Sequence, residues 1–275
     1  MTSKNLPPWQ FEAFRNFLSF EMLQQACAAL CSRNGISLSR AEKDLRYLND
    51  SLLARTGREW TPDRIPGGNV VWQTEGSLFR NKKRVFTGFY LLDPSAFDDL
   101  GVLSLTDFGQ ALGLGLVSSN EFYERIVKTF EFPHPAYREN WEWWTGANLK
   151  LRPLALILEV LIYLSEFSSE FAGISIAEMA HFGGATPMNG TGPEIAKRIL
   201  ESRMAGGSFS HTRSDALDRK IGDMFGFLAM TPFAVKRGSE LALNPLRTDA
   251  ENSVNSWLSV EAIKEIVAPL TKEGL

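Results

Sequence analysis

The chain has 275 residues, of which 44% are hydrophobic and 22% charged, and its formal net charge at pH 7 is −3. This length suggests one large domain or two of ordinary size, and the hydrophobic fraction excludes a mostly disordered chain. The slightly acidic balance excludes a polybasic protein that binds nucleic acid by bulk charge. Any nucleic-acid contact must therefore come from local basic patches.

Cysteine usage and hydropathy favour a cytoplasmic protein with no membrane partner. The two cysteines, Cys27 and Cys31, have no histidine nearby, so they cannot form a closed zinc site, and they suit a reducing compartment. The N-terminus lacks the basic-then-apolar pattern of a signal peptide. The longest apolar run, over 154–164, is too short to span a bilayer and contains Glu159.

The first part of the chain predicts two helices. Apolar residues that recur three and four positions apart predict a helix over 11–32, which Gly35 ends. Ser39 and Glu42 form a capping-box pattern, and the regularly spaced leucines after them predict a second helix, which Gly57 closes.

A hairpin and two further helices are expected next. Aromatic and β-branched residues predict strands over 84–92 and 102–106, which pair with each other. Thr106 is expected to cap the helix that follows, and Ser119 or Asn120 to cap the one after it.

The second half of the chain follows an irregular, tryptophan-rich connector over 136–152. Pro153 begins a helix over 153–167 that is apolar on almost all sides, which is typical of a helix at the centre of a fold. After a short helix capped by Ser175, the pattern predicts helices over 194–206 and 210–230, a hairpin over 233–245 and an amphipathic helix over 250–275.

Each half therefore runs helices first and a two-stranded hairpin last, which is the order of a winged helix-turn-helix. The predicted fold is mainly α with small β-hairpins, arranged as tandem winged helix-turn-helix units. The expected domains are an N-terminal winged-helix-like unit over 1–148, a second winged-helix unit over 149–248, and a C-terminal helix or linker over 249–275.

The sequence predicts no catalytic residue and no metal ligand. Its three histidines lie far apart, and no nucleophile, phosphate-loop or zinc-protease spacing occurs. Asp63, which follows a proline, and Glu75 are the nearest approach to the paired carboxylates of a metal-dependent nuclease. The lysine that such a centre needs is out of place, so a turn at Asp63 is the simpler interpretation.

Local basic clusters are more informative about function. Lys and Arg side chains contact phosphates and guanine edges, and the hydroxyl groups of Ser and Thr and the ring of His can make further contacts to phosphates and bases. One cluster precedes the first hairpin, one lies on the predicted second helix, and the others lie on the helices and hairpin of the second half. The candidate DNA-binding residues are Arg40, Lys43, Arg46, Arg80, Lys82, Lys83, Arg84, Lys197, Arg198, Arg203, Ser210, His211, Arg213, Arg219, Lys220, Lys236 and Arg237.

The order of these segments resembles the recognition region of type IIS restriction endonucleases of the AlwI kind and of their nicking relatives. The resemblance covers about 85–250 and rests on an aromatic strand, a turn, a strand ending in L-T-x-x-G, a helix, a proline-punctuated break and a further apolar helix. The positions that match are Leu105, Thr106, Gly109, Glu121, Lys128, Phe132, Pro133 and Pro153.

The resemblance implies winged-helix subdomains that read a short asymmetric site in double-stranded DNA, as part of a restriction-modification system. In that family a separate C-terminal domain cuts the DNA with Mg²⁺. The chain stops about where that domain is expected to begin, so we expect a recognition fragment or a specificity subunit with a separate nuclease partner. No cofactor is expected in this chain itself.

Two alternatives stay open at this point. One is a winged-helix transcription factor or a scaffold whose surfaces bind protein. The other is a complete restriction nuclease with a degenerate metal site around Asp63 and Glu75.

Overall fold

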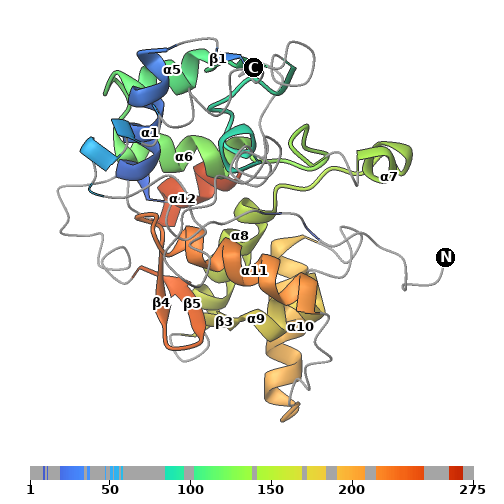
Figure 1. The fold of residues 1–275 in the computed structure, drawn as a ribbon. Coiled ribbons are helices and arrows are strands. Elements are labelled where there is room, and N and C mark those ends of the chain that lie inside the picture. Colours follow the sequence, from blue (N-terminus) through green and yellow to red (C-terminus); the bar gives the residue numbers. More distant parts are fainter. Residues whose placement is uncertain are drawn as a thin grey trace, which may run out of the picture. The chain divides into compact units, whose positions relative to one another are not determined.

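The structure is a computed structural model, shown in Figure 1, and it describes residues 9, 11, 19–33, 36–37, 47, 50–51, 53–55, 57, 84–95, 102–137, 141–168, 172–183, 191–207, 215–244 and 260–268. The chain divides into two compact units. The first comprises Met1–Phe11, Tyr123–His134 and Arg138–Leu275, and the second comprises Glu12–Phe122 and Pro135–Tyr137.

In the second unit, helices α1 (Phe20–Cys31) and α5 (Asp107–Gly113) pack directly against each other. A Cβ atom at Gly113 would lie 2.7 Å from the backbone carbonyl carbon of Cys27, so only glycine permits this approach. Cys27 is buried in the contact, and burial raises the pKa of its thiol. The cysteines of α1 are therefore packing residues, as their spacing suggests.

The predicted strand over 84–92 is wrong, because residues 84–88 are helical. The amide of Phe89 donates to the carbonyl of Val85 at 3.0 Å, which is a helical bond, and both side chains are buried. Residues 85–89 are all buried, and a short run that is buried on every side satisfies strand and helix periods equally, so the sequence pattern does not distinguish the two. Only Leu92 pairs as predicted, in an isolated antiparallel bridge to Leu105.

The other half of the predicted hairpin does form a strand, but with a different partner. Strand β2 (Val102–Leu103) pairs antiparallel with β1 (Ile36–Ser37), a segment far away in the sequence. A hairpin is recognised from the turn residues between its two strands. Strands that are far apart in the sequence have no such turn between them, so the sequence does not indicate this pairing.

Helix ends in this part of the chain follow local chemistry. Thr106 caps α5 as predicted, since its Oγ1 accepts from the amide of Gly109 at 3.0 Å. Helix α6 (Ser119–Thr129) begins where expected, but its cap is Ser118, whose Oγ accepts from the amide of Glu121 at 3.3 Å. The Glu121 carboxylate accepts from the amide of Ser118 in return, which completes a capping box.

The first unit is built around helix α8 (Pro153–Phe167), whose burial on nearly every side confirms the prediction of a central helix. Helices α10 (Gly192–Met204) and α12 (Val260–Val267) pack against it. Arg152, just before α8, donates to the carbonyl of Ala268 at 2.8 Å and so joins the two helix ends. The connector is less irregular than expected, because it contains the short helix α7 (Trp141–Gly146).

A three-stranded antiparallel sheet in the order β3-β5-β4 completes this unit. Strands β4 (Ala234–Arg237) and β5 (Glu240–Leu243) form the predicted hairpin, whose turn places Gly238 at φ +62°. Strand β3 (Gly173–Ser175), which the sequence did not predict, pairs with β5 and brings Ser175 opposite Glu240.

The described residues between β3 and β4 are mainly helical. The short helix α9 (Ile176–Glu178) is capped by Ser175 as predicted, and it continues as a π-helical turn, η5 (Met179–Gly183). Helices α10 and α11 (Asp215–Leu228) follow, and α11 contacts α9, η5 and β4. A mainly helical fold with small antiparallel sheets is thus confirmed.

Within the described residues, no helix is both long and apolar enough to cross a membrane. The two compact units do not share the limits of the predicted domains 1–148, 149–248 and 249–275. Compactness alone does not define an independently folding domain, so those domain limits stay a prediction.

Candidate nucleic-acid interface

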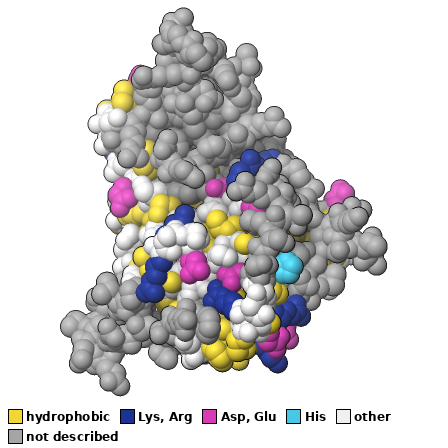
Figure 2. All heavy atoms as spheres, turned by 90° about the horizontal axis from the view of Figure 1, so that it is seen from below, with side chains coloured by type: hydrophobic (Ala, Val, Ile, Leu, Met, Phe, Trp, Pro, Cys, Tyr) yellow, Lys and Arg dark blue, Asp and Glu magenta, His cyan; other side chains and the backbone are white. Residues whose placement is uncertain are grey.

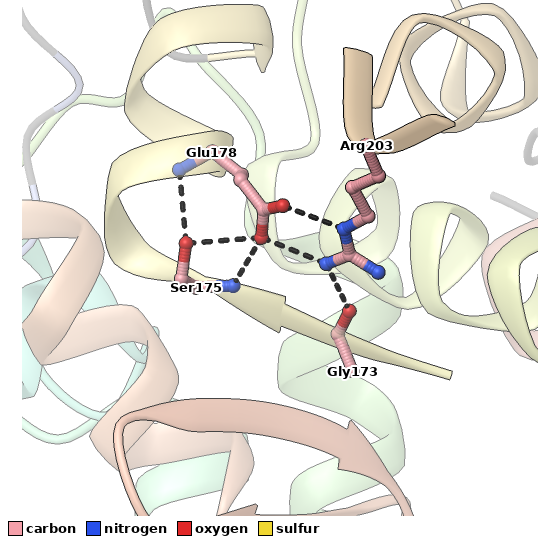
Figure 3. Close-up of polar contacts among 4 residues, drawn as sticks. All are labelled: Gly173, Ser175, Glu178 and Arg203. Atoms are coloured by element: carbon pink, nitrogen blue, oxygen red, sulfur yellow. Dashed lines mark hydrogen bonds and ion pairs between the residues drawn. The ribbon is translucent and has the colours of Figure 1, made fainter. Parts of the chain in front are cut away.

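A polar cluster, drawn in Figure 3, joins β3, α9 and α10. Arg203, near the end of α10, donates from Nε to Oε1 of Glu178 at 2.7 Å and from Nη2 to Oε2 at 2.8 Å. The same Nη2 donates to the carbonyl oxygen of Gly173 at 2.7 Å. One guanidinium group therefore ties α10 to both α9 and β3.

Ser175 completes this cluster from the other side. Its amide and its hydroxyl each donate to Oε2 of Glu178 at 2.9 Å, and its hydroxyl accepts from the amide of Glu178 at 3.2 Å. Burial of Glu178 opposes its ionisation, but the hydrogen bonds from Arg203 and Ser175 and the charge of Arg203 outweigh it. The pKa of Glu178 is therefore lowered from its ordinary value.

Two of the predicted DNA-binding residues, Arg203 and Lys220, have side chains that are largely or fully buried. The side chain of Arg203 is 15% exposed and committed to Glu178 and Gly173, so it holds the fold together. Lys220 is buried, and its Nζ donates to the carbonyl oxygen of Phe11 at 3.1 Å. A buried cation bonded to protein oxygens cannot reach a phosphate without breaking those bonds, and this is the physical reason for correcting both assignments.

Among the described residues of the first unit, five of the predicted DNA-binding residues are exposed, and they lie on three elements. Helix α10 carries two of them, α11 one and the β4–β5 hairpin two. They are Lys197, Arg198, Arg219, Lys236 and Arg237.

Acidic residues accompany some of these cations. On α10, Lys197 forms an ion pair with Glu201 at 3.9 Å, and Glu194 lies one turn before it. On the hairpin, Arg237 is the cross-strand neighbour of Glu240. Figure 2 shows the same mixture, since Lys and Arg side chains share the face seen from below with Asp and Glu side chains.

The remaining candidates are distributed as follows. Arg84 is partly exposed in the helical segment over 84–88 of the second unit. The others lie outside the described residues, namely Arg40, Lys43, Arg46, Arg80, Lys82, Lys83, Ser210, His211 and Arg213. Their assignment stays a prediction.

The described residues include no group of three or more His, Cys, Asp or Glu side chains placed to hold a metal ion. Asp63 and Glu75, the residues of the alternative nuclease centre, lie outside the described residues. Of the described histidines, His134 is buried against the ring of Phe130, and burial lowers its pKa to about 4.

The charged residue that interrupts the apolar pattern of α8 positions the neighbouring helix. Oε2 of Glu159 accepts from the amide of Gly192 at 3.3 Å, and a Cβ atom at Gly192 would lie 2.3 Å from Cβ of Glu159. A carboxylate at the start of α10 also complements the helix dipole. In the sequence, the signal for this role is a single carboxylate, Glu159, inside the apolar run over 154–164.

The fold is similar to that of a known DNA-binding protein. The chain superimposes on the BpuJ1 endonuclease binding domain, solved in complex with pyrene- and phenanthrene-modified DNA, with a TM-score of 0.66. The match covers 96% of this chain and 87% of that chain at 14% sequence identity, so it is a likeness of fold. No protein-family model matches the sequence, and no curated protein matches it either.

Proposed function

We propose that this chain binds double-stranded DNA sequence-specifically, as the target-recognition part of a restriction endonuclease system. The observation that carries the proposal is the likeness, over 96% of the chain, to an endonuclease binding domain solved on DNA. The type IIS character that the order of the sequence segments suggests is part of this proposal, and no family model or curated protein matches the sequence to support it. In this proposal the nuclease is a separate domain or subunit that uses Mg²⁺, and the system is cytoplasmic.

The first unit acts as a winged helix in this proposal. Its order of β3, α9 with η5, α10, α11 and the β4–β5 hairpin is helices first and hairpin last. Helix α11 directly precedes the hairpin and contacts β4, so we assign α11 as the recognition helix and the hairpin as the wing. A second winged helix in the other unit belongs to the proposal as well.

The proposed DNA surface of this unit consists of Arg219 on α11 together with Lys236 and Arg237 on the hairpin, all of which are exposed. Arg198 on the neighbouring helix is also exposed and is the next candidate. We leave Lys197 out of this surface, because its Nζ already pairs with the Glu201 carboxylate at 3.9 Å.

Selection from a random pool of duplex DNA tests this function directly. The purified chain is expected to enrich a short sequence motif, and a labelled duplex containing that motif should bind more tightly than a scrambled one in a fluorescence-anisotropy titration. Recovery of no enriched motif would contradict the proposal and favour the alternative of a protein-binding scaffold. Cutting of plasmid with Mg²⁺ by the chain alone would instead favour the nuclease alternative.

Replacing Arg219 with alanine is expected to weaken binding to the selected duplex by about 1–3 kcal/mol, because a recognition-helix arginine pairs bidentately with guanine. Preference for the base that it reads should relax at the same time. Anisotropy titrations against single-base variants of the site measure both effects. Lys150→Ala is the matched control, since Lys150 is 75% exposed in the same unit but lies outside this surface.

The two wing cations, Lys236 and Arg237, are expected to contact phosphates of the DNA and not the base edges. Replacing Lys236 and Arg237 together with alanine should weaken binding by a similar factor for all sequences. It should also reduce the slope of log K against log salt by about 2, because two phosphate contacts are lost. Titrations at several salt concentrations measure the slope, and an unchanged slope would remove the hairpin from the DNA surface.

A further inference from the structure

A second surface of the first unit has a different chemistry. A groove of about 370 Å³ runs between α8 and α10, and its lining includes Tyr163, Phe167, Leu200 and Met204. Three of these large side chains are exposed, namely Tyr163 at 44%, Phe167 at 56% and Met204 at 63%. Large apolar side chains gathered at one groove mark a surface that another protein covers.

The charges on this surface form a regular pattern along α10. Glu194, Lys197, Glu201 and Met204 follow a three-four-three spacing, which places them in one stripe along the helix. Lys197 and Glu201 lie one turn apart, with side chains that are 75% and 59% exposed, and both line the groove. The stripe therefore carries two acidic groups and one basic group beside the apolar Met204.

This pattern is complementary to itself. When two copies of α10 lie antiparallel about a two-fold axis between positions 197 and 201, Lys197 of each copy faces Glu201 of the other. Two reciprocal ion pairs then lie beside the axis, Met204 of each copy lies outside them, and the groove side chains of both copies are covered together. A two-fold interface requires this property, because the same patch must serve on both sides.

We infer that the α8–α10 face binds a second copy of this chain and forms a two-fold dimer. A duplex DNA ligand suits this face poorly, because it combines an apolar groove with Glu194 and Glu201. A partner with only basic groups would leave Lys197 opposed by like charge. The inference goes beyond the proposed DNA-binding function and does not depend on it.

Sedimentation equilibrium of the full chain without DNA, over a wide concentration range, is the direct test. The wild-type chain is expected to show a reversible monomer–dimer equilibrium. Met204→Glu, an exposed substitution that leaves the core intact, should shift the chain to monomer. The control Leu116→Glu changes a residue of the other unit that is equally exposed, at 73%, and should leave the dimer unchanged.

Charge reversal provides the decisive comparison. Lys197→Glu should weaken the dimer roughly tenfold or more, because both ion pairs are replaced by like-charge contacts. The double variant Lys197→Glu with Glu201→Lys should restore it, because each copy again presents opposite charges to the other. A wild-type chain that stays monomeric, or a double variant as weak as the single one, would overturn the inference whatever the result of the DNA experiments.

Discussion

Replacing Arg203 with methionine is expected to lower the free energy of unfolding by about 3 kcal/mol, because it leaves the Glu178 carboxylate buried without its cation. The carbonyl oxygen of Gly173 loses a donor at the same time. Urea denaturation followed by circular dichroism measures the change. Lys150→Met removes a comparable cation from an exposed ion pair with Glu131, and should change stability by less than about 0.5 kcal/mol.

The pH dependence of this effect distinguishes lost pairing from lost packing. The pKa of Glu178 is lowered in the folded chain, so its stabilising contribution is present above the ordinary value of 4.5 and is lost as the pH falls through the lowered value. The difference between wild type and Arg203→Met should therefore shrink below about pH 4.5. A difference that is constant down to pH 3 would show that packing of the arginine stem, rather than charge, carries the effect.

A double-mutant cycle extends the test. In the chain that carries both Arg203→Met and Glu178→Gln, no buried charge is left without a partner. Its loss of stability should therefore be smaller than the sum of the two single losses. Additive losses would mean that the two side chains act independently, in spite of their two hydrogen bonds.

The contacts of Arg203 could not be predicted from the sequence. Its helical spacing after Lys197 and Arg198 makes it look like part of one basic surface, and the sequence does not reveal which of the three turns inward. The partner, Glu178, could be recognised as the third residue of a capping box begun by Ser175. The pairing of Glu178 with an arginine in another helix depends on how the helices pack, which no local pattern specifies.

Features that depend on neighbouring residues were predicted well. The cap at Thr106, the proline at the start of α8 and the β4–β5 turn all follow from local backbone chemistry, and all are present. Features that depend on distant contacts were missed, such as strand β3 and the pairing of β1 with β2. The proposed DNA surface is an intermediate case. Composition indicates its candidate residues, but only the fold shows that Lys220 is buried.

A glycine of α5 is expected to be as sensitive as the Arg203 cluster. A Cβ atom at Gly109 would lie 2.2 Å from the backbone oxygen of Leu91 and 3.0 Å from Cδ2 of Leu105. That oxygen also accepts from the amide of Thr106 at 3.1 Å, so the start of the helix is fixed against this segment. Gly109→Ala should therefore destabilise the chain by about 3 kcal/mol, because backbone must move to admit the methyl group.

Gly226 of α11 offers the matched control, because a Cβ atom there meets nothing within 4 Å. Alanine is the better helix former, so Gly226→Ala should stabilise the chain by about 0.5–1 kcal/mol. The same substitution is thus expected to have opposite signs in two helices, and thermal or urea denaturation of both variants measures this. Since helix propensity favours alanine at both sites, only the close approach of Leu91 accounts for a loss at Gly109. A gain at both positions would show that this approach does not exist.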